Sequence, residues 1–314
     1  MTTRPAPRTA QAPAPPKWHR TALRAAPWLA RLGFLTPNAS ERAALALRDA
    51  APALRSAAEV VFLIPLVGRD AVQDWPGTVA RLHATLAQFQ RQTDPRWRAV
   101  ICGQDAPDDL PDDPRIAWLP FTEEVDGNDK WAKLAALTAP GSAHLQTPAY
   151  AMTFDADDLA SPDLVAEMLT RAAPGGYLVE RGYVWNVGTG AVGAARPQSL
   201  TEPGAKAFWK LCGSCAALRI DPAAGPEGPA LLQAMSAHEH RMFPHLAALA
   251  GQRLTPLRAA SVVYLLNHGD NFGARRGRVG FKARYVDRFA LSPSERAAFD
   301  AAFPGLIQSP TDGP

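Results

Sequence analysis

The fold of this chain is decided by residues 149–158, which read AYAMTFDADD. The six mostly apolar residues predict a strand that is buried on both faces, as in a parallel sheet. Three carboxylates follow it within four positions, at Asp155, Asp157 and Asp158. Open α/β sheets bind ligands at the carboxyl edge of their strands, so this turn is the first candidate for a functional site.

The acidic turn has two interpretations. Carboxylates this close together raise one another's pKa unless a cation lies among them, and hard oxygen ligands favour Mg²⁺ or Mn²⁺. These ions commonly carry a diphosphate in their remaining coordination positions. The alternative is an acidic turn in which Asp158 caps the following helix.

The sequence before this turn supplies more of a parallel sheet. Residues 60–64 (VVFLI), 97–102 and 115–119 predict three further strands. After residues 75–77 (WPG), apolar residues at helical spacing from Val79 to Phe89 predict a helix. Strand, helix and strand in succession imply a right-handed parallel crossover. We therefore expect an α/β fold with an open, mostly parallel central sheet flanked by helices.

After Pro174 the pattern becomes mixed. Residues 177–187, 214–220 and 262–266 predict strands of a smaller, mixed half. A helix capped by Ser161 is expected before it. A second helical stretch covers 231–249, where Pro244 must kink or split it.

The composition excludes several classes of protein. The chain has 314 residues, 47% hydrophobic and 20% charged, which predicts a substantial core. A net charge of +3 gives no reason to expect a nucleic-acid partner. No apolar run approaches the ~20 residues of a spanning helix, and no secretory signal is evident, so we expect a cytoplasmic location. Three cysteines supply neither a complete disulfide framework nor a four-thiolate zinc site, and a redox role for the pair Cys212 and Cys215 is disfavoured.

The first 57 residues form an arm before the main domain. Residues 1–16 are rich in Pro and Ala, whereas 17–35 interleave two tryptophans with four Lys or Arg. Such a segment either lies on an anionic membrane surface, as a peripheral contact, or packs back on the domain. A short helix over 41–50, capped by Ser40, completes the arm.

Three motifs in order resemble a family 2 glycosyltransferase of the GT-A fold, over residues 58–273. Residues 62–65 (FLIP) resemble the opening strand of that family, and 92–98 (QTDPRWR) resemble its Q-T-x-P-x-W segment. Residues 154–158 (FDADD) then match its metal motif. The order and approximate spacing of the three are far more selective than any one of them.

The resemblance implies a metal-dependent, inverting transfer of a sugar from a nucleoside diphosphate donor to a hydroxyl acceptor. A UDP-sugar is the expected donor, Mn²⁺ or Mg²⁺ the expected ion, and a glycan or glycolipid of a surface polysaccharide pathway the expected acceptor. By position, Asp105 should face the nucleobase, Asp155 the ribose and the metal, and Asp157 the metal. Further donor-binding positions are Pro65, Arg69 and Lys133.

The resemblance also implies roles in the second half of the chain. Glu239 stands where the family places the base that removes the acceptor proton, with His238 or His240 as candidates to share that role. His268 is expected to complete the metal shell, with Asp270 as its competitor.

A basic run near residue 276 has a further implied role. Arg275 and Arg276 are suited to closing over the diphosphate leaving group. The alternative is that these two arginines belong to a solvated basic loop.

The sequence departs from the family at two places. One acidic residue, Asp105, ends the second strand where the family often has two, and His238-Glu239 replaces an acidic pair. Three histidines and an ordinary Glu on a surface helix therefore remain an alternative for residues 238–245. These residues are also not a zinc-protease motif, because Met242 stands where its second histidine is required.

With these roles the chain divides into four parts: an arm over 1–57, a nucleotide-sugar-binding half over 58–160, an acceptor-binding half with its closing loop over 161–290, and a C-terminal helix and tail over 291–314.

Two rival functions remain. One is a phosphatase of the haloacid-dehalogenase kind with Asp155 as nucleophile and Asp157 as acid, although Leu159 replaces its expected Thr. The other is a GT-A-like domain that binds a nucleotide sugar or glycan without turning it over.

Overall fold

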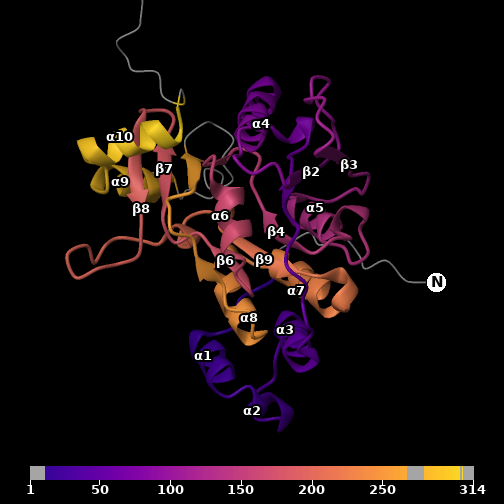
Figure 1. The fold of residues 1–314 in the computed structure, drawn as a ribbon. Helices are drawn as coiled ribbons and strands as arrows, with labels where there is room; N and C mark the ends of the chain where they lie inside the picture. Colours follow the sequence, from indigo (N-terminus) through magenta and orange to yellow (C-terminus); the bar gives the residue numbers. More distant parts are fainter. Residues whose placement is uncertain (1–10, 267–278, 305, 307–314) are drawn as a thin grey trace, which may run out of the picture.

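The structure is a computed structural model. Its central feature is a seven-stranded sheet (Figure 1). The structure describes residues 11–266, 279–304 and 306. The strand order is β10-β6-β9-β4-β1-β2-β3. The strands are β1 (Glu59–Pro65), β2 (Trp97–Gly103), β3 (Ile116–Pro120), β4 (Ala149–Thr153), β6 (Gly176–Leu178), β9 (Ala216–Ile220) and β10 (Thr255–Pro256).

Strands β1, β2, β3 and β4 are parallel, and β9 is antiparallel to both of its neighbours. The predicted open, mostly parallel sheet is confirmed, and it agrees with the GT-A-like fold that the resemblance implies. In β1 every residue from 60 to 64 is buried, which explains the uninterrupted apolar run. Leu63 pairs with Val100 of β2 on one side and Thr153 of β4 on the other, so these strands end at one edge.

The second sheet has four strands in the order β5-β11-β7-β8. Its strands are β5 (Leu159–Ala160), β7 (Gly182–Asn186), β8 (Ala191–Ala195) and β11 (Val262–Leu266). Because β5 begins directly after Asp158 and pairs with β11, the acidic turn connects the two sheets.

The prediction of one strand over 177–187 was wrong. β6 and β7 belong to different sheets, and β7 begins so close to Phe208 that a Cβ on its first residue, Gly182, would lie 2.3 Å from that ring. Strand β8 was not predicted.

Helices cover both faces of the large sheet. Their bounds are α1 (Lys17–Ala25), α2 (Trp28–Arg31), α3 (Ala39–Ala50), α4 (Trp75–Gln90), α5 (Lys130–Leu137), α6 (Leu164–Arg171), α7 (Glu227–Ser236), α8 (Phe243–Leu249), α9 (Val279–Arg288) and α10 (Pro293–Ala302). Helix α4 makes the crossover from β1 to β2, where Phe89 stacks on Phe62 of β1 at 4.0 Å between ring centroids. The predicted crossover between these strands is confirmed.

Short 3₁₀ helices complete the connections: η1 (Arg69–Ala71), η2 (Ala143–Leu145), η3 (Phe208–Lys210), η4 (Pro222–Ala224) and η5 (His240–Met242). In the part of the chain that the structure describes, no helix combines the length and the apolarity needed to span a bilayer.

Three helix boundaries differ from the expected ones. Asn38, not Ser40, caps α3, because its side chain accepts from the backbone N–H of Glu41 while the Glu41 carboxylate accepts from the N–H of Asn38. Helix α6 begins after Asp163 rather than after Ser161. Pro244 lies in the first turn of α8, which splits the helical stretch expected over 231–249.

The N-terminal arm packs back on the domain, which was one of the two alternatives that the sequence left open. Leu23 of α1 is fully buried, and α1 contacts α8. Buried Glu41 of α3 accepts from His245 at 3.0 Å and lies 3.3 Å from His19. The arm is therefore joined to the domain by apolar and polar contacts.

Candidate functional site

The acidic turn is held in place from α4. Thr85 Oγ1 lies 2.9 Å from the carbonyl oxygen of Ala156 and 2.8 Å from that of Asp158. The N–H of Phe154 donates to the carbonyl of Leu63 at 2.9 Å, which extends the pairing with β1 to the last residue before the turn. The turn is thus fixed at the carboxyl edge of the parallel strands, where the sequence predicts a site.

Asp155 faces a lysine that the sequence analysis did not single out. Lys130 Nζ lies 2.6 Å from Asp155 Oδ1, and the N–H of Asp155 donates to Ser214 Oγ at 2.8 Å. Burial lowers the pKa of Lys130, but the charge of Asp155 and the hydrogen bond to it raise that pKa above its usual value. Lys130 therefore stays charged beside the carboxylates.

Asp158 is part of the interior. Its side chain is fully buried, and its Oδ2 accepts from Ser214 Oγ at 2.5 Å and Cys212 Sγ at 2.9 Å. Among the described residues no group donates to its Oδ1. Burial, followed by the charges of Asp157 and Asp155, raises the pKa of Asp158 well above the ordinary value. Asp158 therefore favours the protonated form and does not cap α6.

The raised pKa of Asp158 predicts a pH dependence of stability. The folded state retains a proton that the unfolded chain loses near pH 4, so stability should fall as the pH rises above that value. Asp158→Asn cannot ionise and should be more stable than the wild type at pH 8 and less sensitive to pH. Melting temperatures at pH 5 and pH 8 in EDTA check this. Equal pH sensitivity of the two proteins would contradict it.

The donor side of the edge brings three predicted residues together. Pro65 ends β1 and pairs with Cys102 of β2, and Asp105 follows β2. The N–H of Arg69 donates to Asp105 Oδ2 at 2.9 Å, and the Arg69 guanidinium lies over the ring of Trp75 at 5.3 Å. The loops after β1 and β2 therefore meet where the resemblance implies a nucleoside.

Lys133 lies beneath this edge rather than on it. Its side chain is fully buried, with Nζ donating to the carbonyl of Leu66 at 2.6 Å and lying 2.7 Å from Asp129 Oδ2. It supports the loop after β1 and presents no surface to a ligand in this structure. Lys130, one helical turn earlier, is the lysine of α5 that reaches the acidic turn.

The two lysines predict opposite phenotypes. Lys133→Met leaves Asp129 largely buried without its ion pair and should lower the free energy of unfolding by about 3 kcal/mol. Lys130→Met breaks the more exposed ion pair with Asp155, so it should cost less stability than Lys133→Met but weaken nucleotide binding. Urea unfolding combined with nucleotide titration separates the two effects. Reversed phenotypes would assign the donor site to Lys133 instead.

Glu239 lies in the connection between α7 and η5, not on a surface helix as the alternative had it. Its side chain is 40% exposed, with Oε1 3.4 Å from Arg241 Nε. His238 beside it is buried, and its ring contacts Ser40 Oγ at 2.8 Å and the carbonyl of Ala12 at 3.1 Å. The structure therefore places His238 against the arm and leaves Glu239 as the accessible carboxylate.

His240 connects this segment to the acidic turn. Its Nδ1 lies 2.5 Å from the carbonyl of Trp209, and burial lowers its pKa to about 4. Downstream of Trp209, a Cβ on Gly213 would lie 3.3 Å from Asp155, and Ser214 contacts Asp155 and Asp158. Residues 209–214 thus bridge His240 and the carboxylates.

The structure adds a second cation and a phenol that the sequence analysis missed. Lys282 of α9 donates to Tyr264 Oη at 2.9 Å, and its Nζ lies 4.2 Å from the centre of that ring. Burial lowers the pKa of Lys282, although the charges of Asp158 and Asp155 oppose that shift. No local motif marks α9, because its position beside the turn is set by the tertiary fold.

Several predicted residues lie outside the described residues: His268, Asp270, Arg275 and Arg276. Within the described ranges, no three His, Cys, Asp or Glu side chains are grouped so that they could hold a metal ion. A hard divalent cation is commonly held by one or two carboxylates and substrate phosphates. Asp155 and Asp157, both half-buried on the turn, fit that donor set.

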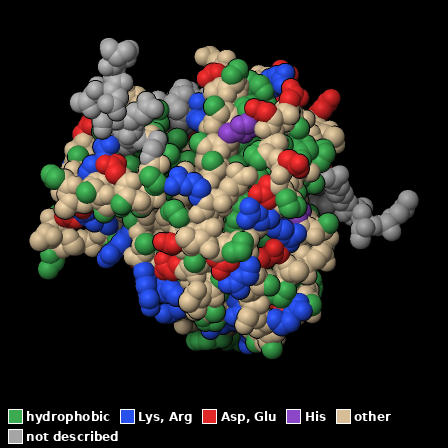
Figure 2. All heavy atoms as spheres, turned by 45° about the horizontal axis from the view of Figure 1, so that its top comes forward, with side chains coloured by type: hydrophobic (Ala, Val, Ile, Leu, Met, Phe, Trp, Pro, Cys, Tyr) green, Lys and Arg blue, Asp and Glu red, His purple; other side chains and the backbone are tan. Residues whose placement is uncertain are grey.

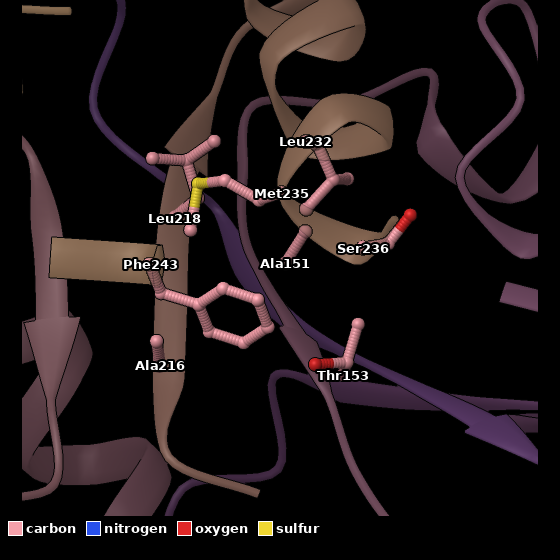
Figure 3. A pocket seen from close by; sticks show the side chains of 8 residues that line it. All are labelled: Ala151, Thr153, Ala216, Leu218, Leu232, Met235, Ser236 and Phe243. Carbon is pink, nitrogen blue, oxygen red and sulfur yellow. The ribbon is translucent and has the colours of Figure 1, made fainter. Parts of the chain in front are cut away.

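One cavity lies apart from the turn. It is lined by residues of β4, β9, α7 and α8, among them Ala151, Leu218, Met235 and Phe243, and it is almost entirely apolar (Figure 3). With about 10 Å³ it has room for one water molecule at most. It is a packing defect between helices and sheet and not a substrate site.

Comparison with known proteins found no matching family model and no matching curated sequence. Among solved structures, TarS 1–349 of S. aureus covers 78% of this chain and 78% of its own at 10% identity, with a TM-score of 0.36. The mannosyltransferase PcManGT from Pyrobaculum calidifontis, solved with GDP-Man and Mn²⁺, covers 90% of this chain and 80% of its own at 15% identity, with a TM-score of 0.37. Both scores lie below 0.5, so the function of this chain is inferred from its own site.

Proposed function

We propose that this protein is a metal-dependent, inverting glycosyltransferase that moves a sugar from a nucleoside diphosphate to a hydroxyl acceptor. One observation carries the proposal: the turn with Asp155 and Asp157 follows β4 at the edge where β1 and β2 also end, and a cation, Lys130, already lies against it. Negative charge flanked by a lysine suits a site for a metal diphosphate.

The residues divide into two groups by their role toward the donor. Arg69 and Asp105 would hold the nucleoside, and Asp155 and Asp157 would hold Mn²⁺ or Mg²⁺, with His268 as a further ligand. A bound ion supplies Lewis-acid stabilisation of the diphosphate leaving group.

Cationic side chains would add to that stabilisation. Lys130 and Lys282 would offset the negative charge that develops on the diphosphate, and Arg275 and Arg276 would close over it.

Glu239 would act as the base. Inversion needs a carboxylate that removes the acceptor proton as the new glycosidic bond forms. The Glu239 side chain is 40% exposed. The His238 ring is buried and contacts Ser40 Oγ, and His240 Nδ1 is engaged by the carbonyl of Trp209. This difference favours Glu239 over either histidine.

A UDP-sugar is our preferred donor, with a glycan or glycolipid of surface polysaccharide synthesis as acceptor and the cytoplasm as location. A thermal-shift screen of UDP, GDP and dTDP with and without Mn²⁺ tests the donor class, because a ligand that binds only the folded state raises its melting temperature. We expect a metal-dependent rise of melting temperature for one nucleotide, UDP first. No metal-dependent rise with any nucleotide would overturn the proposal.

A further inference from the structure

Exposed apolar side chains are concentrated on the N-terminal arm. Six large apolar side chains of the described residues are exposed, and four of them lie within residues 18–34. They are Trp18 (68% exposed), Trp28 (55%), Leu32 (63%) and Phe34 (73%). Single exposed apolar residues are ordinary on a soluble surface, but such a concentration marks an interaction site.

The packing of α1 makes this exposure a fixed property of the fold. The opposite side of α1 buries Leu23, places Arg20 Nη1 3.5 Å from Met242 Sδ, and places His19 beside Glu41. Trp18 is therefore turned outward as long as these contacts hold. Figure 1 shows α1 and α2 at one end of the molecule, away from α4 and α10.

Charge is concentrated in the same part of the chain. The first 40 residues contain six of the 33 Lys and Arg and none of the 30 Asp and Glu, so the rest of the chain has an excess of acidic residues. Lys17 and Arg24 are exposed on α1, and neither pairs with an acidic side chain of the described residues. Arg31 pairs with Asp49, and both side chains of this pair remain exposed. In Figure 2 Lys and Arg side chains (blue) are frequent over the lower part of the face drawn.

We propose that the outer face of α1 and α2, the arm face, docks on an anionic lipid bilayer. The arm face consists of Lys17, Trp18, Arg24, Trp28, Leu32 and Phe34. Amphipathic aromatic rings settle at the headgroup level, and neighbouring cations contact lipid phosphates. Protein interfaces instead surround an apolar core, depleted of charge, with a polar rim, and here the cations are interleaved with the aromatic rings.

Vesicle sedimentation of the full chain tests this docking. We expect binding to vesicles of phosphatidylcholine with phosphatidylserine, weak binding to phosphatidylcholine alone, and loss of binding at high salt. Removing both cations in the variant Lys17→Gln, Arg24→Gln should weaken binding about 25-fold, since each cation near an anionic leaflet contributes about five-fold. Trp18→Ser with Trp28→Ser should abolish the blue shift of tryptophan fluorescence on vesicle addition.

Matched control variants carry the same kinds of substitution at positions outside the arm face. Arg91→Gln with Arg253→Gln removes two exposed cations elsewhere, and Leu200→Ser removes a fully exposed apolar side chain elsewhere. Both controls should bind vesicles as the wild type does. All substituted side chains are exposed, so unchanged melting temperatures are expected and would show that folding is intact.

Three outcomes would overturn the docking proposal: no wild-type binding to anionic vesicles, equal binding by the arm-face variants, or a dimer in sedimentation equilibrium that the tryptophan substitutions dissociate. The last outcome would identify the arm face as an interface between two copies of the chain. Nucleotide binding in the thermal-shift screen does not involve the arm face. The proposed transferase function can therefore stand or fall independently.

Discussion

Asp157→Asn should abolish metal-dependent donor binding and lower transfer by about 10³-fold. The substitution removes an anionic ligand and leaves the charge of the diphosphate without compensation, and metal stabilisation of such charge contributes several kcal/mol. The side chain keeps its shape, so the fold should be unaffected. Calorimetric titration with UDP and Mn²⁺, paired with a transfer assay, measures both effects.

Asp112→Asn provides the matched control. It makes the same change of charge at an exposed position between β2 and β3 and should bind nucleotide and Mn²⁺ as the wild type does. If Asp157→Asn also binds both as the wild type does, the metal is held elsewhere in the chain.

Glu239→Gln should lower the rate of transfer by about 10²–10⁴-fold while donor affinity stays nearly intact. Glutamine preserves size and hydrogen bonding but accepts no proton from the acceptor hydroxyl at neutral pH. An effect on kcat without an effect on nucleotide binding distinguishes the base from a donor ligand. Steady-state kinetics and nucleotide titration of the same preparation provide this test.

Glu227→Gln, at the opposite end of α7, is the control for the base. It should transfer sugar at the wild-type rate. Wild-type turnover by Glu239→Gln together with loss in His240→Ala would move the base to the histidine. Because His238 contacts the arm, His238→Ala should instead lower stability.

The parallel half of the fold follows from local signals in the sequence. The apolar runs over 60–64 and 149–152 are buried on both faces. The second half is harder to predict, because β5 and β10 have two residues each and β7 begins against Phe208, which is distant in sequence.

The candidate site likewise has residues that the sequence reveals and residues that only the folded structure brings together. The acidic turn and Asp105 are visible in the sequence because they directly follow strands. Lys130 and Lys133 are three positions apart on one helix, and only the packing of α5 decides which of them is buried. Ser214 contacts the turn from the segment before β9, and Lys282 of α9 contacts Tyr264 of β11, so no spacing in the sequence could reveal them.

Metal-dependent cleavage of a nucleotide sugar tests the central proposal most directly. Phosphorus NMR of the protein with UDP-sugars and GDP-sugars, with Mn²⁺ or with EDTA, distinguishes the possible reactions. The transferase proposal predicts slow release of a nucleoside diphosphate in Mn²⁺, accelerated by an acceptor and absent in EDTA and in Asp157→Asn. Binding without cleavage would indicate a binding domain, and release of inorganic phosphate from phosphomonoesters would indicate a phosphatase; either result would contradict the transferase proposal.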